Sequence, residues 1–276
     1  MNIDRQVLID AGILKKPPRE VAEERGQDKP NQAQVLVELA GEAIFIFTPR
    51  GDVFASVPVG QHRENWPVRG KGFRRWLVRR FAEVYDKPPG AQALQDAIGL
   101  LEARAETAGQ RGEVHTRLAE RDGAIYLDLG NAAWQAVEVT ASGWRLVSEP
   151  PVFFWRPRGM LPLPAPQAGG TLAELAEFVN LGEERARVLA ISWLLAAARP
   201  QGPYLLLMLH GEQGTGKTLL ARFLKALLDP SAVEVRTSPR DERDLMIAAA
   251  NNWVLAFDNL SGLSGWLSDG LCRLAS

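Results

Sequence analysis

The feature that most constrains the fold is a glycine-rich stretch, residues 211–218, which directly follows the apolar run 204–209. It fits the pattern G-x-x-x-x-G-K-[ST]. Glycines in such a loop let backbone N–H groups converge on phosphate oxygens at the start of a helix. A short apolar run bounded by Gly-Pro precedes the loop, and leucines at helical spacing follow it as far as Asp229-Pro230. The sequence therefore predicts a buried strand, a phosphate-binding loop and a helix, whereas the alternative is a glycine-rich turn before a core helix.

The loop predicts that the chain binds a nucleotide, with ATP and Mg²⁺ as ligands. Lys217 supplies a positive charge for the β and γ phosphates, and Thr218 offers its hydroxyl to the magnesium ion. The candidate nucleotide-binding residues are Gly211, Glu212, Gln213, Gly214, Thr215, Gly216, Lys217 and Thr218.

A second segment, residues 253–258, supplies the acidic residue that a magnesium–phosphate site needs. It is an apolar run that ends in Asp258, as in the Walker B segment of nucleotide-binding proteins. We therefore expect Thr218 and Asp258 to hold the metal, and we name Lys217, Asp258 and Asn259 as candidate catalytic residues. Asn259 stands where many ATPases have a glutamate, and an amide can only orient water rather than accept its proton. Hydrolysis is thus less firmly predicted than binding.

The fold class that follows is an α/β P-loop NTPase domain over residues 171–276, with a partial parallel sheet. Strands are expected at 204–209, 232–235 and 253–258, and helices lie between them and after Asp258. Because an ordinary sheet has about five or six strands, we expect this domain to be C-terminally incomplete.

A smaller α+β domain is predicted to precede it. With 276 residues, the chain has room for about two domains. We expect a mobile tail at 1–31, an α+β domain at 32–155 and a proline-rich linker at 156–170. The α+β domain should contain two amphipathic helices, a hairpin within 44–59, and a strand at 114–118 that leads into a hairpin turn at Asp122-Gly123. Two helices with a break near 180–182 should follow the linker.

Residues 70–85 form a predicted helix that could contact DNA. Lys71, Arg75 and Arg79 are four residues apart and share one face, opposite an apolar stripe, and Arg74 adds a further charge. The alternative to DNA binding is a solvated cationic face that neighbouring acidic residues neutralise. The candidate DNA-binding residues are Lys71, Arg74, Arg75 and Arg79.

Composition argues against several other classes of protein. The net charge is −1, so any nucleic-acid contact depends on a local patch. A single cysteine and scattered histidines give no support for a disulfide or for zinc. No apolar run is long enough to cross a bilayer and no export signal is visible, so we expect a cytoplasmic protein without a membrane partner.

Together these motifs resemble the helicase-type P-loop ATPases of phage, plasmid and integrative-element primase-helicase proteins, relatives of the superfamily-three and poxvirus primase-helicases. The resemblance rests on residues 202–218, 239–245, 253–261 and 267–275, and extends upstream to 62–67. It implies a DNA-associated replication ATPase that forms a homo-oligomeric ring on single-stranded DNA, with primase or other replication proteins as partners. Further catalytic strands of that family are missing here, so the sequence leaves open whether this chain hydrolyses ATP.

Two other functions remain open from the sequence alone. One is a non-hydrolysing, nucleotide-gated adaptor, which Asn259 favours. The other is a P-loop phosphotransferase, which would need an arginine-rich lid that is not visible.

Overall fold

The computed structural model describes residues 31–179, 183–260 and 262–276, and they form two compact units that divide between Glu113 and Val114. Of the predicted tail at 1–31, only Asn31 is among the described residues; its side chain accepts a hydrogen bond from Gln34 N and caps the first helix. The predicted break between two helices near 180–182 lies outside the described residues.

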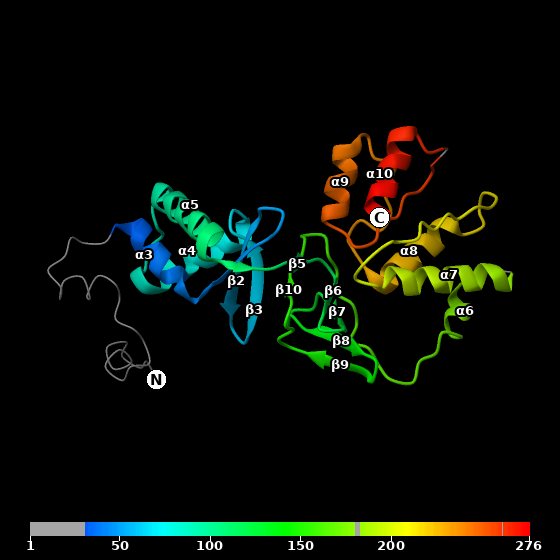
Figure 1. The fold of residues 1–276 in the computed structure, drawn as a ribbon, viewed down its shortest axis with the longest axis horizontal. Helices are drawn as coiled ribbons and strands as arrows, with labels where there is room; N and C mark the ends of the chain where they lie inside the picture. Colours follow the sequence, from blue (N-terminus) through cyan, green and yellow to red (C-terminus); the bar gives the residue numbers. More distant parts are fainter. Residues whose placement is uncertain (1–30, 180–182, 261) are drawn as a thin grey trace. The chain divides into compact units, whose positions relative to one another are not determined.

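The first unit is a four-stranded sheet with helices packed on one face (Figure 1). The strand order is β3-β2-β1-β4, antiparallel except for the β1–β4 pair. Its elements are α3 (Gln32–Leu39), η1 (Ala40–Glu42), β1 (Ile44–Phe47), β2 (Val53–Val59), β3 (His62–Pro67), α4 (Lys71–Tyr85), α5 (Ala91–Ala108) and β4 (Gln110–Arg111).

The core of this unit follows from the alternation of β2. Val53, Ala55 and Val57 point to the helix side, where they join Phe73 and Leu77 of α4 in one buried cluster. The hairpin predicted at β1 and β2 and the two amphipathic helices are confirmed. Strand β3 was not predicted, because its polar residues lack the apolar alternation of a strand; its register with β2 holds it in the sheet.

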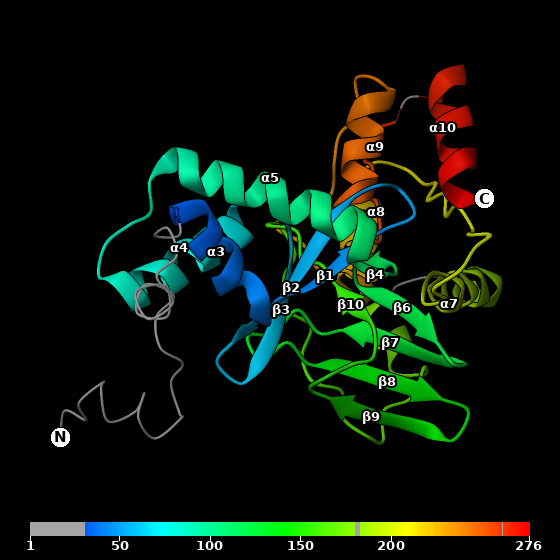
Figure 2. The ribbon, with the colours of Figure 1, turned by 60° about the vertical axis from the view of Figure 1, so that its left-hand side comes forward.

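The second unit begins with an antiparallel sheet in the order β6-β7-β8-β9, with its strands side by side in Figure 2. These strands are β6 (Leu118–Arg121), β7 (Ala124–Asp128), β8 (Ala136–Thr140) and β9 (Gly143–Val147), and β5 (Val114–His115) pairs with β10 (Phe153–Phe154). Asp122 and Gly123 both have positive φ, 54° and 77°, as the predicted Asp-Gly hairpin turn requires. The predicted strand at 114–118 is divided between β5 and β6.

Five helices follow in the described part of this unit: α6 (Leu175–Phe178), α7 (Glu184–Ala197), α8 (Lys217–Leu228), α9 (Glu242–Ala250) and α10 (Gly265–Ala275). Helices α9 and α10 lie side by side (Figures 1 and 2), linked by an Arg273–Glu242 ion pair of 2.8 Å. None of the helices in the described ranges is long and apolar enough to cross a membrane.

The three parallel strands predicted for this unit are not formed as a ladder among the described residues. Residues 204–209 have no strand assignment, and Leu205 and Met208 are 58% and 63% exposed. Arg236, the residue after segment 232–235, forms a single parallel bridge with Phe257 of segment 253–258. A parallel strand is stable where neighbours pair with it and both faces are covered, and segment 204–209 has neither here.

The two units divide between residues 113 and 114 and not in the predicted linker at 156–170. Residues 160–163 of that linker form hydrogen bonds with other parts of the second unit. Leu161 N donates to Pro230 O at 2.9 Å, Leu163 N donates to Leu129 O at 2.8 Å, and Met160 bridges Ser231. Leu161 and Leu163 lie between prolines but have backbone N–H groups of their own, and both groups donate hydrogen bonds. Residues 114–163 therefore belong with the nucleotide-motif half of the chain.

Two helical glycines provide a matched test of the first unit. A Cβ at Gly72 would lie 2.2 Å from the Trp66 ring, whereas one at Gly99 meets nothing within 4 Å. We expect Gly72→Ala to destabilise the unit by about 1–3 kcal/mol through overpacking. Gly99→Ala should stabilise it by about 0.5–1 kcal/mol. Chemical denaturation measures both, and equal effects would contradict the packing described here.

Candidate functional site

Two glycines of the glycine-rich loop have a left-handed backbone. Gly214 and Gly216 have φ of 84° and 82°, a left-handed region that glycine enters without steric cost. Gly216 is the N-cap of α8 and offers no side chain to the first turn. Residues 211–216 are exposed, and no side chain caps the first N–H groups of α8, so these groups are available to bind an anion.

Lys217 lies against the loop that it is predicted to serve. Its Nζ donates to Gly211 O at 2.9 Å and to Glu212 O at 2.6 Å. The hydroxyl of Thr215 donates to Glu212 O at 2.9 Å and so closes the same turn. These bonds place the ammonium group beside the loop backbone.

The structure brings together the two predicted metal ligands. Thr218 Oγ1 donates to Asp258 Oδ2 at 2.8 Å, although 40 positions separate the two residues in the chain. The other carboxylate oxygen accepts from Asn259 N at 2.8 Å, and Asn259 has a φ of 56°. Both oxygens of Asp258 are thus fixed in direction.

A hydroxyl beside a carboxylate is a donor set that suits magnesium, which prefers hard oxygen ligands and shares them with substrate phosphates. Within the described ranges, no three His, Cys, Asp or Glu side chains gather as metal ligands. Thr218 and Asp258 are the described residues that could hold Mg²⁺ here.

A buried carboxylate ties α8 to the segment that carries Asp258. Asp229 follows the last turn of α8 and is 2% exposed. Its Oδ2 accepts from the backbone N–H groups of Trp253 and Val254 at 2.8 and 3.0 Å. Lys225 Nζ contacts the same oxygen at 3.2 Å and donates to Val254 O at 2.6 Å.

Arg117, in the connection between β5 and β6, completes this network. Its side chain is fully buried, and Nε donates to Asp229 Oδ1 at 3.2 Å. The remaining nitrogens donate to the backbone oxygens of Asp128, Leu161 and Pro230. Asp128 in turn forms a two-contact ion pair with Arg156, at 2.8 and 2.5 Å.

Burial shifts the ionisation of both cations of this network. Desolvation lowers the pKa of Lys225 and that of Arg117, and the charge of Asp229 partly opposes each shift. Asp229 therefore neutralises two positive charges that the interior would otherwise disfavour.

Sequence reasoning missed Lys225, Asp229 and Arg117. Asp229-Pro230 was interpreted only as the end of a helix, although a Lys–Asp pair at i and i+4 on an apolar helix was a usable signal. Arg117 gave no local signal, because its partner Asp229 lies 112 positions further along the chain.

The predicted DNA-contacting residues divide into two groups. Lys71, Arg75 and Arg79 are exposed on α4 and form no ion pair with another described residue. Arg74 is half-buried and donates to Gln95 Oε1 at 3.0 Å, so it is tied to α5. The neighbouring Arg80 forms ion pairs with Glu42 and Glu83. This is the neutralisation by acidic residues that the alternative to DNA binding expected for the whole cationic face.

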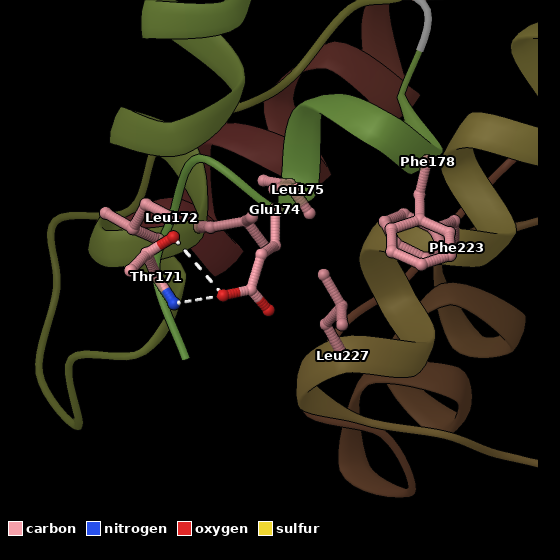
Figure 3. Close-up of a pocket in the computed structure, with 8 residues that line it drawn as sticks. Thr171, Leu172, Glu174, Leu175, Phe178, Phe223 and Leu227 are labelled. Carbon is pink, nitrogen blue, oxygen red and sulfur yellow. Dashed lines mark hydrogen bonds between the residues drawn. The ribbon is translucent and has the colours of Figure 1, made fainter. Parts of the chain in front are cut away.

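An apolar pocket of about 380 Å³ lies between α6, α7 and α8, apart from the glycine-rich loop. Figure 3 shows the ring of Phe178 stacked on that of Phe223, with centroids 5.9 Å apart, and Glu174 accepting two hydrogen bonds from Thr171. None of residues 211–218 lines it, so it is separate from the predicted nucleotide site.

Comparison with known proteins bears on the same half of the chain. Residues 172–276 match the model of a family described as actinomycete integrative conjugative element replication protein. No curated protein and no solved structure matches the chain. The match spans α6 to α10, including both nucleotide motifs, and supports a replication protein of a mobile genetic element. At this level the resemblance seen in the sequence is confirmed.

Two acids that pair with cations of α8 test the buried network. Asp229→Ala leaves Lys225 and Arg117 without their buried counter-charge, so we expect a loss of about 3–5 kcal/mol of unfolding free energy. The control Glu234→Ala removes an exposed partner of Arg222, at 3.4 Å, and should cost at most about 1 kcal/mol. Denaturant unfolding measures both; similar small effects would show that the buried network does not stabilise the unit.

Proposed function

We propose that this chain binds ATP with Mg²⁺ through residues 211–218 and Asp258, as the nucleotide-binding part of a helicase-type replication ATPase of an integrative element. The observation that carries the proposal is the 2.8 Å contact between Thr218 Oγ1 and Asp258 Oδ2. It joins the first turn after the loop to the acid that the sequence names as its metal partner. The match to a replication-protein family supports the biological setting.

Residues of this chain would bind the phosphates of the nucleotide and balance their negative charge. The N–H groups at the start of α8 and the ammonium of Lys217 would contact phosphate oxygens. Thr218 and Asp258 would hold the metal ion, which supplies charge neutralisation between the phosphates when bound.

A second candidate, a non-hydrolysing adaptor gated by nucleotide, is favoured by Asn259. Its side chain is an amide and cannot take a proton from water, and its backbone N–H is engaged with Asp258. Phosphate release by the wild-type chain, measured with and without single-stranded DNA, separates the two. Turnover supports the ATPase, and nucleotide binding without turnover supports the adaptor.

Replacing Lys217 tests nucleotide binding directly. A charge-assisted hydrogen bond contributes about 1.5–3 kcal/mol, so Lys217→Ala should weaken ATP binding roughly 10- to 100-fold. Lys87→Ala, which removes an exposed lysine of the first unit, serves as the control and should leave the affinity unchanged. Calorimetric titration with Mg-ATP gives both values; equal affinities in the wild type and Lys217→Ala would exclude this site.

We further propose that Lys71, Arg75 and Arg79 contact DNA phosphates. They are exposed, lie one helical turn apart on α4, and have no acidic partner among the described residues. Helix α4 is anchored by four buried side chains, which hold this row of charges rigid: Phe73, Trp76, Leu77 and Phe81.

The salt dependence of DNA binding tests this row of charges. Replacing Arg75 and Arg79 by Gln should reduce the slope of log K against log salt by about 2, since about one counterion is released per contact. Arg104→Gln on α5 is the control, because Arg104 is exposed but lies outside the row. An unchanged slope in the double variant would remove α4 from the DNA interface.

A further inference from the structure

We infer that Lys225 and Asp229 are positioning residues for the magnesium–nucleotide site, because they fix the start of segment 253–258 and thereby the location of Asp258. The inference rests on the proposed function. Neither side chain is expected to touch the nucleotide or the metal, since both are buried at the end of α8 opposite to the glycine-rich loop.

Helix α8 is joined to the segment at both ends. At its first turn Thr218 meets Asp258, and at its last turn Lys225 and Asp229 hold Trp253 and Val254. The segment therefore runs antiparallel to the helix between two anchors.

The distance between the two anchors requires segment 253–258 to be nearly fully extended. With a rise of 1.5 Å per residue, Thr218 and Asp229 are separated by about 16 Å along α8. An extended chain from Val254 to Asp258 spans at most about 14 Å. A shift of one residue at Val254 would move Asp258 by about 3.3 Å, enough to break its 2.8 Å contact with Thr218.

The buried anchor also satisfies the backbone groups at the start of the segment. Trp253 N, Val254 N and Val254 O all find their partners in the side chains of Asp229 and Lys225. Val254 is 7% exposed, so water cannot replace those partners at low cost. Without the pair, these buried backbone groups would lack their hydrogen-bond partners.

Further contacts hold the segment, among them a bridge to Arg236 and a hydrogen bond from Trp253 Nε1 to Ala197 O at 2.7 Å. Arg236 N donates to Ala256 O and Asp258 N donates to Arg236 O, both at 2.9 Å. The Arg236 bridge fixes the middle and end of the segment, whereas the Lys225–Asp229 pair and the Trp253 indole fix its start. Loss of the pair should therefore loosen the segment without detaching it.

The test uses Lys225→Met in the full chain. Methionine fits a buried position, and Asp229 keeps Arg117 and the two backbone N–H groups as partners, so the fold should persist. Arg222→Met is the matched control, since it removes an exposed cation from the same helix, three residues earlier.

Two measurements are made on each variant. The first is the affinity for a fluorescent ATP analogue in excess Mg²⁺ and in EDTA, whose ratio reports the contribution of the metal. The second is amide hydrogen exchange across residues 253–258 without nucleotide.

In Lys225→Met the ratio should fall by 10-fold or more, as for other residues that orient metal ligands, while the affinity in EDTA changes by less than about 2-fold. Exchange across 253–258 should accelerate, and Arg222→Met should alter neither value. A folded Lys225→Met protein with the wild-type ratio, or with wild-type exchange, would overturn the inference. If the wild type itself binds no nucleotide but the exchange still accelerates, the proposed function fails while the positioning of the segment stands.

Discussion

The second unit depends on one buried carboxylate. Asp229 receives two cations and two backbone N–H groups, which come from the β5–β6 connection, from α8 and from the start of segment 253–258. Burying three charges is costly unless each is paired and hydrogen-bonded, and here all of them are. The network makes the sheet of β6 to β9, the helix after the glycine-rich loop and the Asp258 segment parts of one structure.

The residues that stabilise this unit and the residues proposed to bind a nucleotide lie at opposite ends of α8. The charges that hold the unit together are buried at the end of α8, whereas the glycine-rich loop before its first turn is exposed. A helix whose N-terminus opens to solvent is suited to an anion, and its buried C-terminal end can be used for anchoring. The family match to replication proteins spans these features, so the proposed nucleotide site lies in the part of the chain that the comparison covers.

The sequence predicted local features well and long-range ones poorly. The glycine-rich loop, the amphipathic helices and the Asp-Gly turn follow from spacing and φ preferences, which act over a few residues. Even the Thr218–Asp258 pairing could be predicted, because a known motif specifies both partners. Arg117 could not be, since nothing near position 117 reveals a partner at position 229. Strand 204–209 was predicted from its apolar composition, but a strand also needs neighbours, and composition does not say whether they are in place.

The most direct test of the account is a structure of this chain with a non-hydrolysable ATP analogue and Mg²⁺. It should show the phosphates on the N–H groups of residues 211–218 and the metal beside Thr218 and Asp258. Asp229 should keep its bonds to Trp253 and Val254. A nucleotide bound elsewhere, or a metal site formed with segment 253–258 detached from Asp229, would contradict the account.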